Sequence, residues 1–339
     1  MQRLSRWSAE IALAAVLLAG TVAAASPAWA QWKPSGPITF VVPAGKGGGA
    51  DQMARKIADI AQKEKFVDWP MNVVNEGAGA GAQGFLDVKG DDGDAQKIVI
   101  TLSNLFTTPL STGVPFRWTD LTPVAMLALD EFVLWVNADT PYRTSNQYLA
   151  AVRAAPGKFK MYGTGAKQED QIVTSMIEAA DGVKFTYVPS GGGGTVAKEL
   201  IGKRADSSVN NPIEALDGWR EGKLRPLCVF DAKRMDYREA VAQGKSWYDV
   251  PTCKSQGLDV QYLMLRGIFL PPEVGKDAVT WYVDFLKRVR ATDDWKKFVD
   301  EAAFNPSFMT GADYVKWLQQ AEALHKELMA KAGFLASTN

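Results

Sequence analysis

The feature that most constrains the fold is a glycine-rich loop that occurs three times, each time between an expected strand and an expected helix. The three loops are residues 43–51, 163–168 and 190–195. Strands that alternate with helices are typical of an α/β fold, in which ligands bind beyond the carboxyl ends of the strands. The pattern therefore predicts an α/β chain whose glycine loops lie at a ligand-binding edge.

The rest of the chain follows the same alternation. Short apolar runs predict strands at 38–42, 71–74, 98–102, 132–136, 160–162, 185–188, 224–230 and 262–270. Longer periodic runs predict helices at 53–63, 145–155, 168–180, 195–201, 277–290 and 311–332, and the Gly/Ala loop 77–84 leads into a further helix near Phe85. Such alternation favours parallel sheets with helices on both faces. We expect the last two helices to pack back onto the first unit, with 132–136 and 262–270 as two strands that cross between domains.

Residues 1–30 have the pattern of a secretory signal peptide. Arg3 and Arg6 supply the positive start, residues 11–25 are almost wholly apolar, and Ala28-Trp29-Ala30 matches the small-x-small cleavage pattern. The apolar run is shorter than the ~20 residues that a membrane-spanning helix needs, so an uncleaved anchor is the less favoured alternative. We predict cleavage after Ala30 and a mature chain that works in a bacterial periplasm.

Composition and missing motifs exclude several functions. The chain carries 38 basic and 38 acidic side chains, so it offers no basic footprint for nucleic acid. Two cysteines and a single histidine are too few for a four-ligand zinc site or for clustered-histidine chemistry. We expect that histidine, His325, at the solvated surface of a charged helix. Without a Walker A motif, a G-x-S-x-G elbow or a nucleophile–base pair, we expect no catalysis, no cofactor and no metal.

The two cysteines predict a disulfide. Cys228 lies in a strand-like run and Cys253 follows Pro251 in a turn, and an exported chain meets an oxidising compartment. A Cys228–Cys253 bond across a loop of this size stabilises a protein by ~3 kcal/mol. Two buried thiols are the alternative.

The glycine loops suit an anionic ligand. Glycine lets several backbone N–H groups converge, and the helix that follows directs free N–H donors and partial positive charge at the same point. Loops on two facing domains would clamp a molecule with carboxylates at both ends, although any one loop is also compatible with an ordinary tight turn. We interpret Asp51 mainly as a helix cap or a partner for Arg55, and Lys46 either reaches a ligand carboxylate or points to solvent.

Six segments of the mature chain are similar to the signatures of one known family. They are Ile38-Thr39-Phe40-Val41-Val42-Pro43-Ala44-Gly45 with Gly47-Gly48-Gly49-Ala50-Asp51 and Ala54-Arg55; Asn75-Glu76-Gly77-Ala78-Gly79-Ala80-Gly81; Leu121-Thr122-Pro123-Val124; Ala155-Pro156-Gly157-Lys158; Val188-Pro189 with the glycines 191–194; and Gly222-Lys223-Leu224-Arg225. In order and spacing they resemble the extracytoplasmic solute receptors of tripartite tricarboxylate transporters, the Bug receptor family. This resemblance replaces a weak dinucleotide match, G-x-G-x-x-G, at residues 79–84.

The resemblance implies a fold and a domain organisation. The fold is an α/β, two-domain periplasmic binding protein of the Venus flytrap, type II-like class, with two crossing hinge strands. Domain 1 comprises residues 31–132 and 261–339, and domain 2 comprises residues 133–260.

The resemblance also implies a ligand site made largely of backbone amides. The expected ligand-binding residues are Pro43, Ala44, Gly45, Lys46, Gly47, Gly48, Gly49, Ala50 and Asp51 in the first loop, Ser103 and Asn104 after the third strand, Gly163, Thr164, Gly165, Lys167 and Gln168 in the second loop, Ser190, Gly191, Gly192 and Gly193 in the third loop, and Asn210 and Asn211 at a strand end. Lys46, Ser190 and the charged run 167–170 depart from the family pattern, and these departures bear on ligand identity.

The implied function is transport without catalysis. The expected partners are a small carboxylate, most simply a dicarboxylate, and the permease subunits of a tripartite tricarboxylate transporter, and the receptor is expected to be a monomer. Citrate, C4 diacids, longer aliphatic diacids and aromatic carboxylates all stay open as ligands. Two other functions stay open: a periplasmic sensor input, and an exported hydrolase, against which the absent nucleophile–base pair argues.

Overall fold

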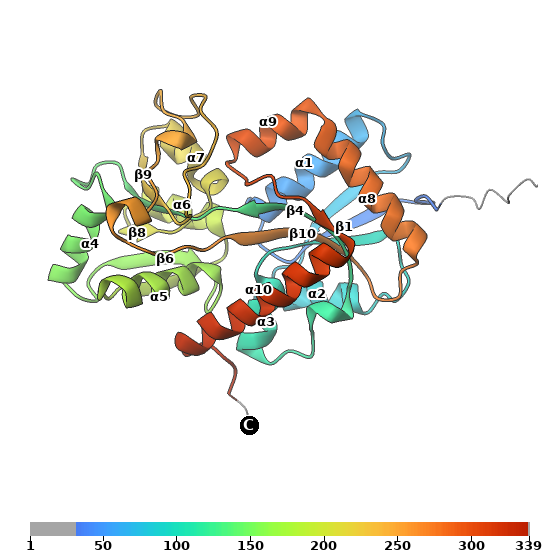
Figure 1. Cartoon of the computed structure of the whole chain (residues 1–339), viewed down its shortest axis with the longest axis horizontal. Helices are drawn as coiled ribbons and strands as arrows, with labels where there is room; N and C mark the ends of the chain where they lie inside the picture. The colour runs from blue at the N-terminus through green and yellow to red at the C-terminus, as the bar shows by residue number, and fades with distance from the viewer. Residues whose placement is uncertain (1–31, 338–339) are drawn as a thin grey trace, which may run out of the picture. The chain divides into compact units, whose positions relative to one another are not determined.

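Two mixed β-sheets, each with helices packed on it, make up the described part of the chain (Figure 1). The structure is a computed structural model that describes residues 32–337. The predicted signal peptide and its cleavage site lie outside the described residues. Within the described range, no helix is both long enough and apolar enough to cross a membrane.

The first sheet has six strands in the order β11–β4–β10–β3–β1–β2. Its strands are β1 (Ile38–Val42), β2 (Met71–Asn75), β3 (Lys97–Thr101), β4 (Thr122–Asp130), β10 (Met264–Leu270) and β11 (Met309–Thr310), and the helices around it are α1 (Gly49–Lys63), α2 (Ala82–Lys89), α3 (Asn104–Thr112), α8 (Lys276–Ala291), α9 (Asp293–Glu301) and α10 (Gly311–Lys331). The apolar sequence of β1 suits a central strand buried on both faces, and Phe40, Val41 and Val42 are fully buried.

The second sheet has five strands in the order β7–β6–β8–β5–β9. Its strands are β5 (Val133–Asn137), β6 (Lys160–Thr164), β7 (Thr186–Ser190), β8 (Ser207–Ser208) and β9 (Leu224–Val229), and its helices are α4 (Ser145–Ala154), α5 (Glu169–Asp181), α6 (Gly193–Ile201) and α7 (Pro212–Arg220); single 3₁₀ turns lie at Trp118–Asp120, Trp247–Asp249 and Lys254–Gln256. Trp135 packs edge-to-face on Trp219 and Trp247, with ring centroids 6.1 and 6.3 Å away, in one core cluster.

The prediction of parallel sheets is correct for only part of each sheet. β1 runs parallel to β2 and β3, and β6 runs parallel to β7 and β8. The prediction is wrong for β10, which is antiparallel to β3 and β4, and for β5, which is antiparallel to β8 and β9. β4 carries the chain toward the second sheet and β10 carries it back, so the two strands run in opposite directions.

The chain passes between the two sheets beside the pair β4–β10, which can be followed in Figure 1. It leaves the first sheet after Asp130 and enters the second at Val133. On its return it still follows β9 at Tyr262, whose N–H donates to the Phe230 carbonyl oxygen (2.9 Å), before β10 begins at Met264. The expected crossing strands 132–136 and 262–270 therefore each pair mainly within one sheet, and the crossings themselves are short.

Six elements were not predicted: α3, α7, α9, β4, β8 and β11. Helix α3 contains Pro109 and several threonines, which are weak helix formers, so its sequence carries little helical signal. Helix α7 does carry a signal, because Asn211 and Glu214 form a capping box and Pro212 occupies the first turn.

The expectation that His325 lies at the solvated surface is wrong. Its side chain is buried, and the ring stacks on Phe106 with centroids 5.0 Å apart. Nδ1 donates to the Ala321 carbonyl oxygen (2.7 Å), which leaves Nε2 to accept the Tyr262 hydroxyl (2.7 Å). The residue belongs to the buried stripe of α10, which includes Leu318 and has helical spacing that the sequence already shows.

We expect His325 to make the protein less stable in mild acid. Burial lowers the pKa of His325 to about 4, below its ordinary 6.5. A lowered folded pKa gives stability that is complete above pH 6.5 and is lost as the pH falls toward 4. The free energy of unfolding should fall by about 2 kcal/mol between pH 7 and pH 5 through this residue. Urea unfolding of the wild type and of His325→Gln at both pH values measures the contribution of His325. An equal pH dependence of the free energy of unfolding in the two proteins would contradict the prediction.

The predicted disulfide is confirmed. Cys228 and Cys253 are bonded, with their Cα atoms 4.9 Å apart, and both are fully buried. The segment around Cys253 lies along β9, because the Cys253 N–H donates to the Val229 carbonyl oxygen (2.9 Å). The bond thus ties a long connection to the edge of the second sheet.

Removing the disulfide should lower the free energy of unfolding by about 3 kcal/mol, since the bond closes a loop with a sequence separation of 25. Urea unfolding of Cys228→Ala/Cys253→Ala beside the oxidised wild type measures the loss. A loss below about 1 kcal/mol would mean that packing around the edge of β9 holds this connection without the bond.

Candidate ligand-binding site

A small cavity of about 40 Å³, here called the interloop cavity, lies where the N-termini of α1, α5, α6 and α7 converge. Its lining comes from both sheets: Ala44, Gly45, Gly48, Gly49, Ala50, Leu102, Met264 and Arg266 from the first, and Thr164, Glu169, Asp170, Gly192, Gly193, Asn211 and Glu214 from the second. Helix N-termini present unpaired N–H groups and partial positive charge, so four of them at one point favour a polar, anion-accepting site.

The first and third loops close over this cavity with their backbones in contact. A Cβ atom added to Gly45 would lie 2.5 Å from the Gly191 carbonyl oxygen, which is closer than side-chain carbons approach a backbone. A side-chain hydrogen bond joins the sheets nearby, from the Thr107 hydroxyl to Gln168 Oε1 (2.6 Å). The structure therefore has the two sheets drawn together around the cavity.

The first loop is held in place by side chains beneath it. Asn104 Nδ2 donates to the Pro43 carbonyl oxygen (2.8 Å), so this predicted site residue supports the loop. Asp51 accepts from the Gly47 N–H (2.9 Å) and from Arg55 Nε (3.0 Å), so it is a partner for Arg55 as expected, whereas the N-cap of α1 is Gly48.

A carboxylate of the protein itself lies at the N-terminus of α1. Glu214, from α7 in the second sheet, accepts through Oε1 from the Gly49 N–H (3.1 Å). Its other oxygen accepts from Asn210 Nδ2 (3.1 Å) and from the Asn211 N–H (3.2 Å). Glu214 also abuts Gly193, where an added Cβ would overlap its carboxyl group. One protein carboxylate thus bridges the N-terminal regions of α1 and α6, where a ligand carboxylate was expected.

Among the described residues that line the cavity, the guanidinium of Arg266 already has a partner. Arg266 Nε donates to Asp130 Oδ2 (2.9 Å), and both side chains are almost completely buried. Burial raises the pKa of Asp130 to about 7, against the attraction of Arg266. The guanidinium lies directly under Gly49, where an added Cβ would collide with it, so a larger residue there would displace the pair.

Two further carboxyl groups come from the first turn of α5. Asp170 Oδ2 accepts from the Thr164 N–H (2.7 Å), which orders the second loop. Glu169 is 3% exposed, and its Oε1 finds no hydrogen-bond partner among the described residues. Burial raises the pKa of Glu169 to about 7, and burial followed by the nearby Glu214 charge raises that of Asp170 well above its usual range.

Some of the predicted site residues line the interloop cavity, and others lie outside its lining. Those that line it are Ala44, Gly45, Gly48, Gly49, Ala50, Thr164, Gly192, Gly193 and Asn211; those outside the lining are Pro43, Lys46, Gly47, Asp51, Ser103, Asn104, Gly163, Gly165, Lys167, Gln168, Ser190, Gly191 and Asn210. Lys46 is exposed to solvent.

Four charged lining residues are absent from the expected ligand-binding residues, although each carries a signal in the sequence. Glu169 and Asp170 belong to the charged run that departs from the family pattern, and Glu214 is the third helical residue in the capping box of α7. Arg266 is a single charge in the middle of the apolar strand β10. A charge in such a position needs a buried partner, and that requirement is the signal of a site.

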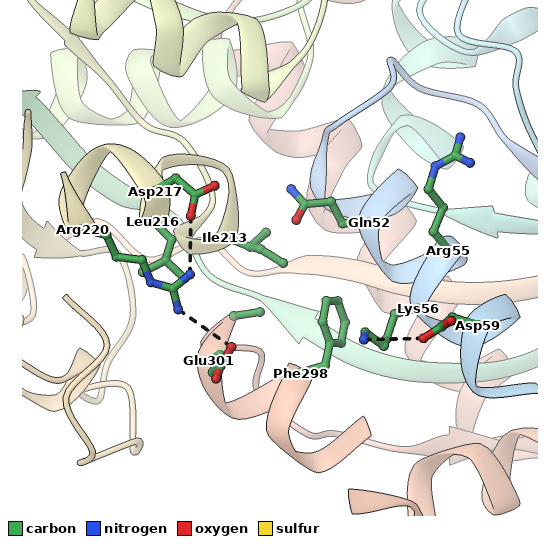
Figure 2. Close-up of a pocket in the computed structure, with 11 residues that line it drawn as sticks. Gln52, Arg55, Lys56, Asp59, Ile213, Leu216, Asp217, Arg220, Phe298 and Glu301 are labelled. Carbon is green, nitrogen blue, oxygen red and sulfur yellow. Dashed lines mark hydrogen bonds and ion pairs between the residues drawn. The ribbon is translucent and has the colours of Figure 1, made fainter. Parts of the chain in front are cut away.

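A larger hollow of about 490 Å³, here called the outer groove, lies among α1, α7 and the end of α9 (Figure 2). Its charges have partners already: Arg220 lies 3.4 Å from Asp217 and 3.8 Å from Glu301, and Lys56 lies 3.9 Å from Asp59. Arg55 pairs with Asp51 (2.9 Å), which lies outside the lining. Ion pairs that remain largely in water keep their hydration and need no ligand to complete their hydrogen bonds. The candidate site is therefore the interloop cavity, whose polar groups are buried.

Fold and cavity together define a class of protein, the α/β periplasmic binding proteins. The family described as "Tripartite tricarboxylate transporter family receptor" matches residues 53–334, so the chain belongs to this family of solute-binding receptors, which are not enzymes. A Cupriavidus necator relative, the "UPF0065 protein in gbd 5'region", is 24% identical over 315 residues, which cover 91% of this chain and 92% of the relative.

Solved structures have the same fold. An R. palustris protein solved with adipate matches with a TM-score of 0.80 and 20% identity, over 88% of this chain and 98% of that one. MatC from Rhodopseudomonas palustris, solved with bound malate, matches with a TM-score of 0.74 and 20% identity, over 87% of this chain and 99% of that one.

Proposed function

We propose that this chain captures a small carboxylate-bearing solute in the periplasm and delivers it to a membrane permease of the tripartite tricarboxylate type. The observation that carries the proposal is that the N-termini of α1 and α6, from different sheets, face one cavity. The first N–H groups of a helix lack partners inside the helix and carry partial positive charge. A carboxylate between the two helices gains hydrogen bonds from both sheets.

The fold neighbours support the class of ligand. Malate and adipate, named for the two R. palustris proteins, are both dicarboxylates. In this chain a ligand carboxylate has room at the start of α1 only if Glu214 moves away from Gly49, because the cavity holds only about 40 Å³ of free space. We therefore expect ligand binding to exchange the protein carboxylate at α1 for that of the ligand.

The proposed mechanism is closure of two lobes around the ligand. The lobes are residues 31–132 with 261–339, and residues 133–260, and they move about the two crossings. A ligand that contacts both lobes only in the closed form shifts the population toward that form. The closed monomer, exported after cleavage behind Ala30, then docks on the permease and releases the solute.

The experiment is a thermal-shift panel on residues 31–339, freed of co-purified ligand by unfolding and refolding. The panel contains mono-, di- and tricarboxylates, amino acids and sugars. A ligand at a hundred times its dissociation constant adds about 2.7 kcal/mol of stability, which raises the melting temperature by several degrees. Shifts confined to carboxylate-bearing compounds support the proposal. Shifts with sugars alone, or with no compound, contradict it.

A further inference from the structure

The charges around the interloop cavity do not suit a ligand that carries only carboxylates. Building on the proposed function, we propose that the solute carries a protonated amine as well as a carboxylate, and that Glu169 accepts a hydrogen bond from this amine. The receptor would then take a small amino acid or an amino diacid in preference to the plain diacid of the same length.

The first step of the argument is the balance of charge in the lining. Glu169, Asp170 and Glu214 bring three carboxyl groups to the cavity. The lining contains one cationic side chain among the residues described, that of Arg266, and Asp130 neutralises it. Because burial already raises the pKa of Glu169 and of Asp170, a dianion placed here would disfavour the ionised forms of these groups further, whereas a cation would favour them.

The second step is the unpartnered oxygen of Glu169. The carboxyl oxygens of Asp170 and Glu214 accept hydrogen bonds from Thr164 and from Gly49, and these bonds order the loops. Glu169 Oε1 is buried and accepts none from the described residues, although the N–H groups of Glu169 and Asn104 and the Arg266 charge act on the carboxyl group and oppose the rise of its pKa. A buried acceptor without a donor is costly, and such groups in native proteins call for an explanation. A donor on the bound solute supplies one.

The third step is the position of donors and acceptors around the same space. N–H groups at the starts of α1 and α6 suit a carboxylate, and Glu169 at the start of α5 suits an ammonium group. An α-amino acid carries a carboxylate and an ammonium group on one carbon atom, and this short separation suits N–H groups and a carboxyl group that line the same cavity. A helix N-terminus accounts for an acidic residue at this position, but it does not account for the oxygen left without a donor.

Binding of an amine should also release protons. Burial raises the pKa of Glu169 to about 7, so near neutral pH a substantial fraction of this carboxyl group is protonated in the empty receptor. A cation beside the carboxyl group favours the ionised form and expels that proton. The release can be measured on the wild-type protein, without any variant.

The experiment is isothermal titration calorimetry on residues 31–339, freed of co-purified ligand, with pairs of compounds that differ only in the amine. The pairs are aspartate and succinate, glutamate and glutarate, and alanine and propionate. We expect the amine-bearing member of at least one pair to bind more than tenfold more tightly. In buffers of different ionisation enthalpy, its binding at pH 7 should release a fraction of a proton.

Glu169→Gln should remove both effects, because it keeps the shape of the side chain without its charge. The preference within the pair should fall below threefold, and proton release should disappear. Glu64→Gln, an exposed glutamate at the end of α1, is the matched control and should behave as the wild type. If Glu169→Gln does not fold, proton release by the wild-type protein on ligand binding still tests the proposed amine contact.

The possible failures are distinct. Equal or tighter binding of the amine-free members, without proton release, overturns the amine inference and leaves the carboxylate receptor standing. Binding of none of these compounds, nor of any other carboxylate in the panel, overturns the proposed function and the inference together.

Discussion

Gly45→Ala should weaken solute binding by about a hundredfold while leaving the ligand-free protein as stable as the wild type. The added Cβ would lie 2.5 Å from the Gly191 carbonyl oxygen, and the atom that it meets belongs to backbone, which cannot move aside as a side chain can. Overlap of this kind costs on the order of 3 kcal/mol, which corresponds to about two powers of ten in a dissociation constant. The overlap occurs only when the first and third loops are in contact, so it does not destabilise the open form of the protein.

Gly191→Ala is the matched control, since it changes the other partner of the same contact. No described atom lies within 4 Å of a Cβ added to Gly191, and its backbone is outside the left-handed region. This variant should bind within about twofold of the wild type, well below the change that 1.4 kcal/mol would cause. Calorimetry with the tightest ligand, beside thermal melts of both empty variants, makes the comparison. Equal affinities for the two variants would show that the loops do not close on the ligand as they do in this structure.

Asp130→Leu should lower the free energy of unfolding by about 3–5 kcal/mol, because it leaves Arg266 buried without its counter-charge. The loss arises from the unpaired charge and not from the pair itself. Asp130→Leu/Arg266→Met, which removes both charges, should therefore come within about 1 kcal/mol of the wild type. Urea unfolding at pH 8, above the pKa of about 7 to which burial raises Asp130, measures both variants with the carboxyl group ionised.

The double variant also carries information on the site. Arg266 supports the first loop from below Gly49, so the double variant should retain stability and lose affinity for the ligand carboxylate. If Asp130→Leu lowers the free energy of unfolding by less than about 1 kcal/mol, water reaches Arg266 in the folded protein and hydrates its unpaired charge.

The parts of the site that depend on local sequence could be predicted. A glycine run between a strand and a helix determines both a backbone shape and the direction of free N–H groups, and this information lies within about ten residues. Gly45, Gly49 and Gly193 lie in such runs, and all three line the interloop cavity. The disulfide was predictable for a similar reason, because two cysteines in an exported chain have only each other as partners.

The parts that depend on contacts between distant segments could not be predicted. The Glu214 side chain lies 165 positions from the Gly49 N–H that it accepts from, and Arg266 lies 136 positions from Asp130. No local pattern links such pairs, so the carboxyl groups that the second sheet contributes to the interloop cavity could not be predicted from the sequence. His325 shows a different cause of error. Its charged neighbours suggested exposure, although its spacing from Leu318 and Ala321 places it on the buried face of α10.

A crystal structure of residues 31–339 with the tightest-binding solute tests the central claim most directly. The account predicts the solute between Gly49 and Gly193, with a carboxylate on the N–H groups at the starts of α1 and α6, an amine within hydrogen-bond distance of Glu169, and Glu214 moved away from Gly49. Solute bound in the outer groove among α1, α7 and α9, with the interloop cavity unchanged, would contradict it.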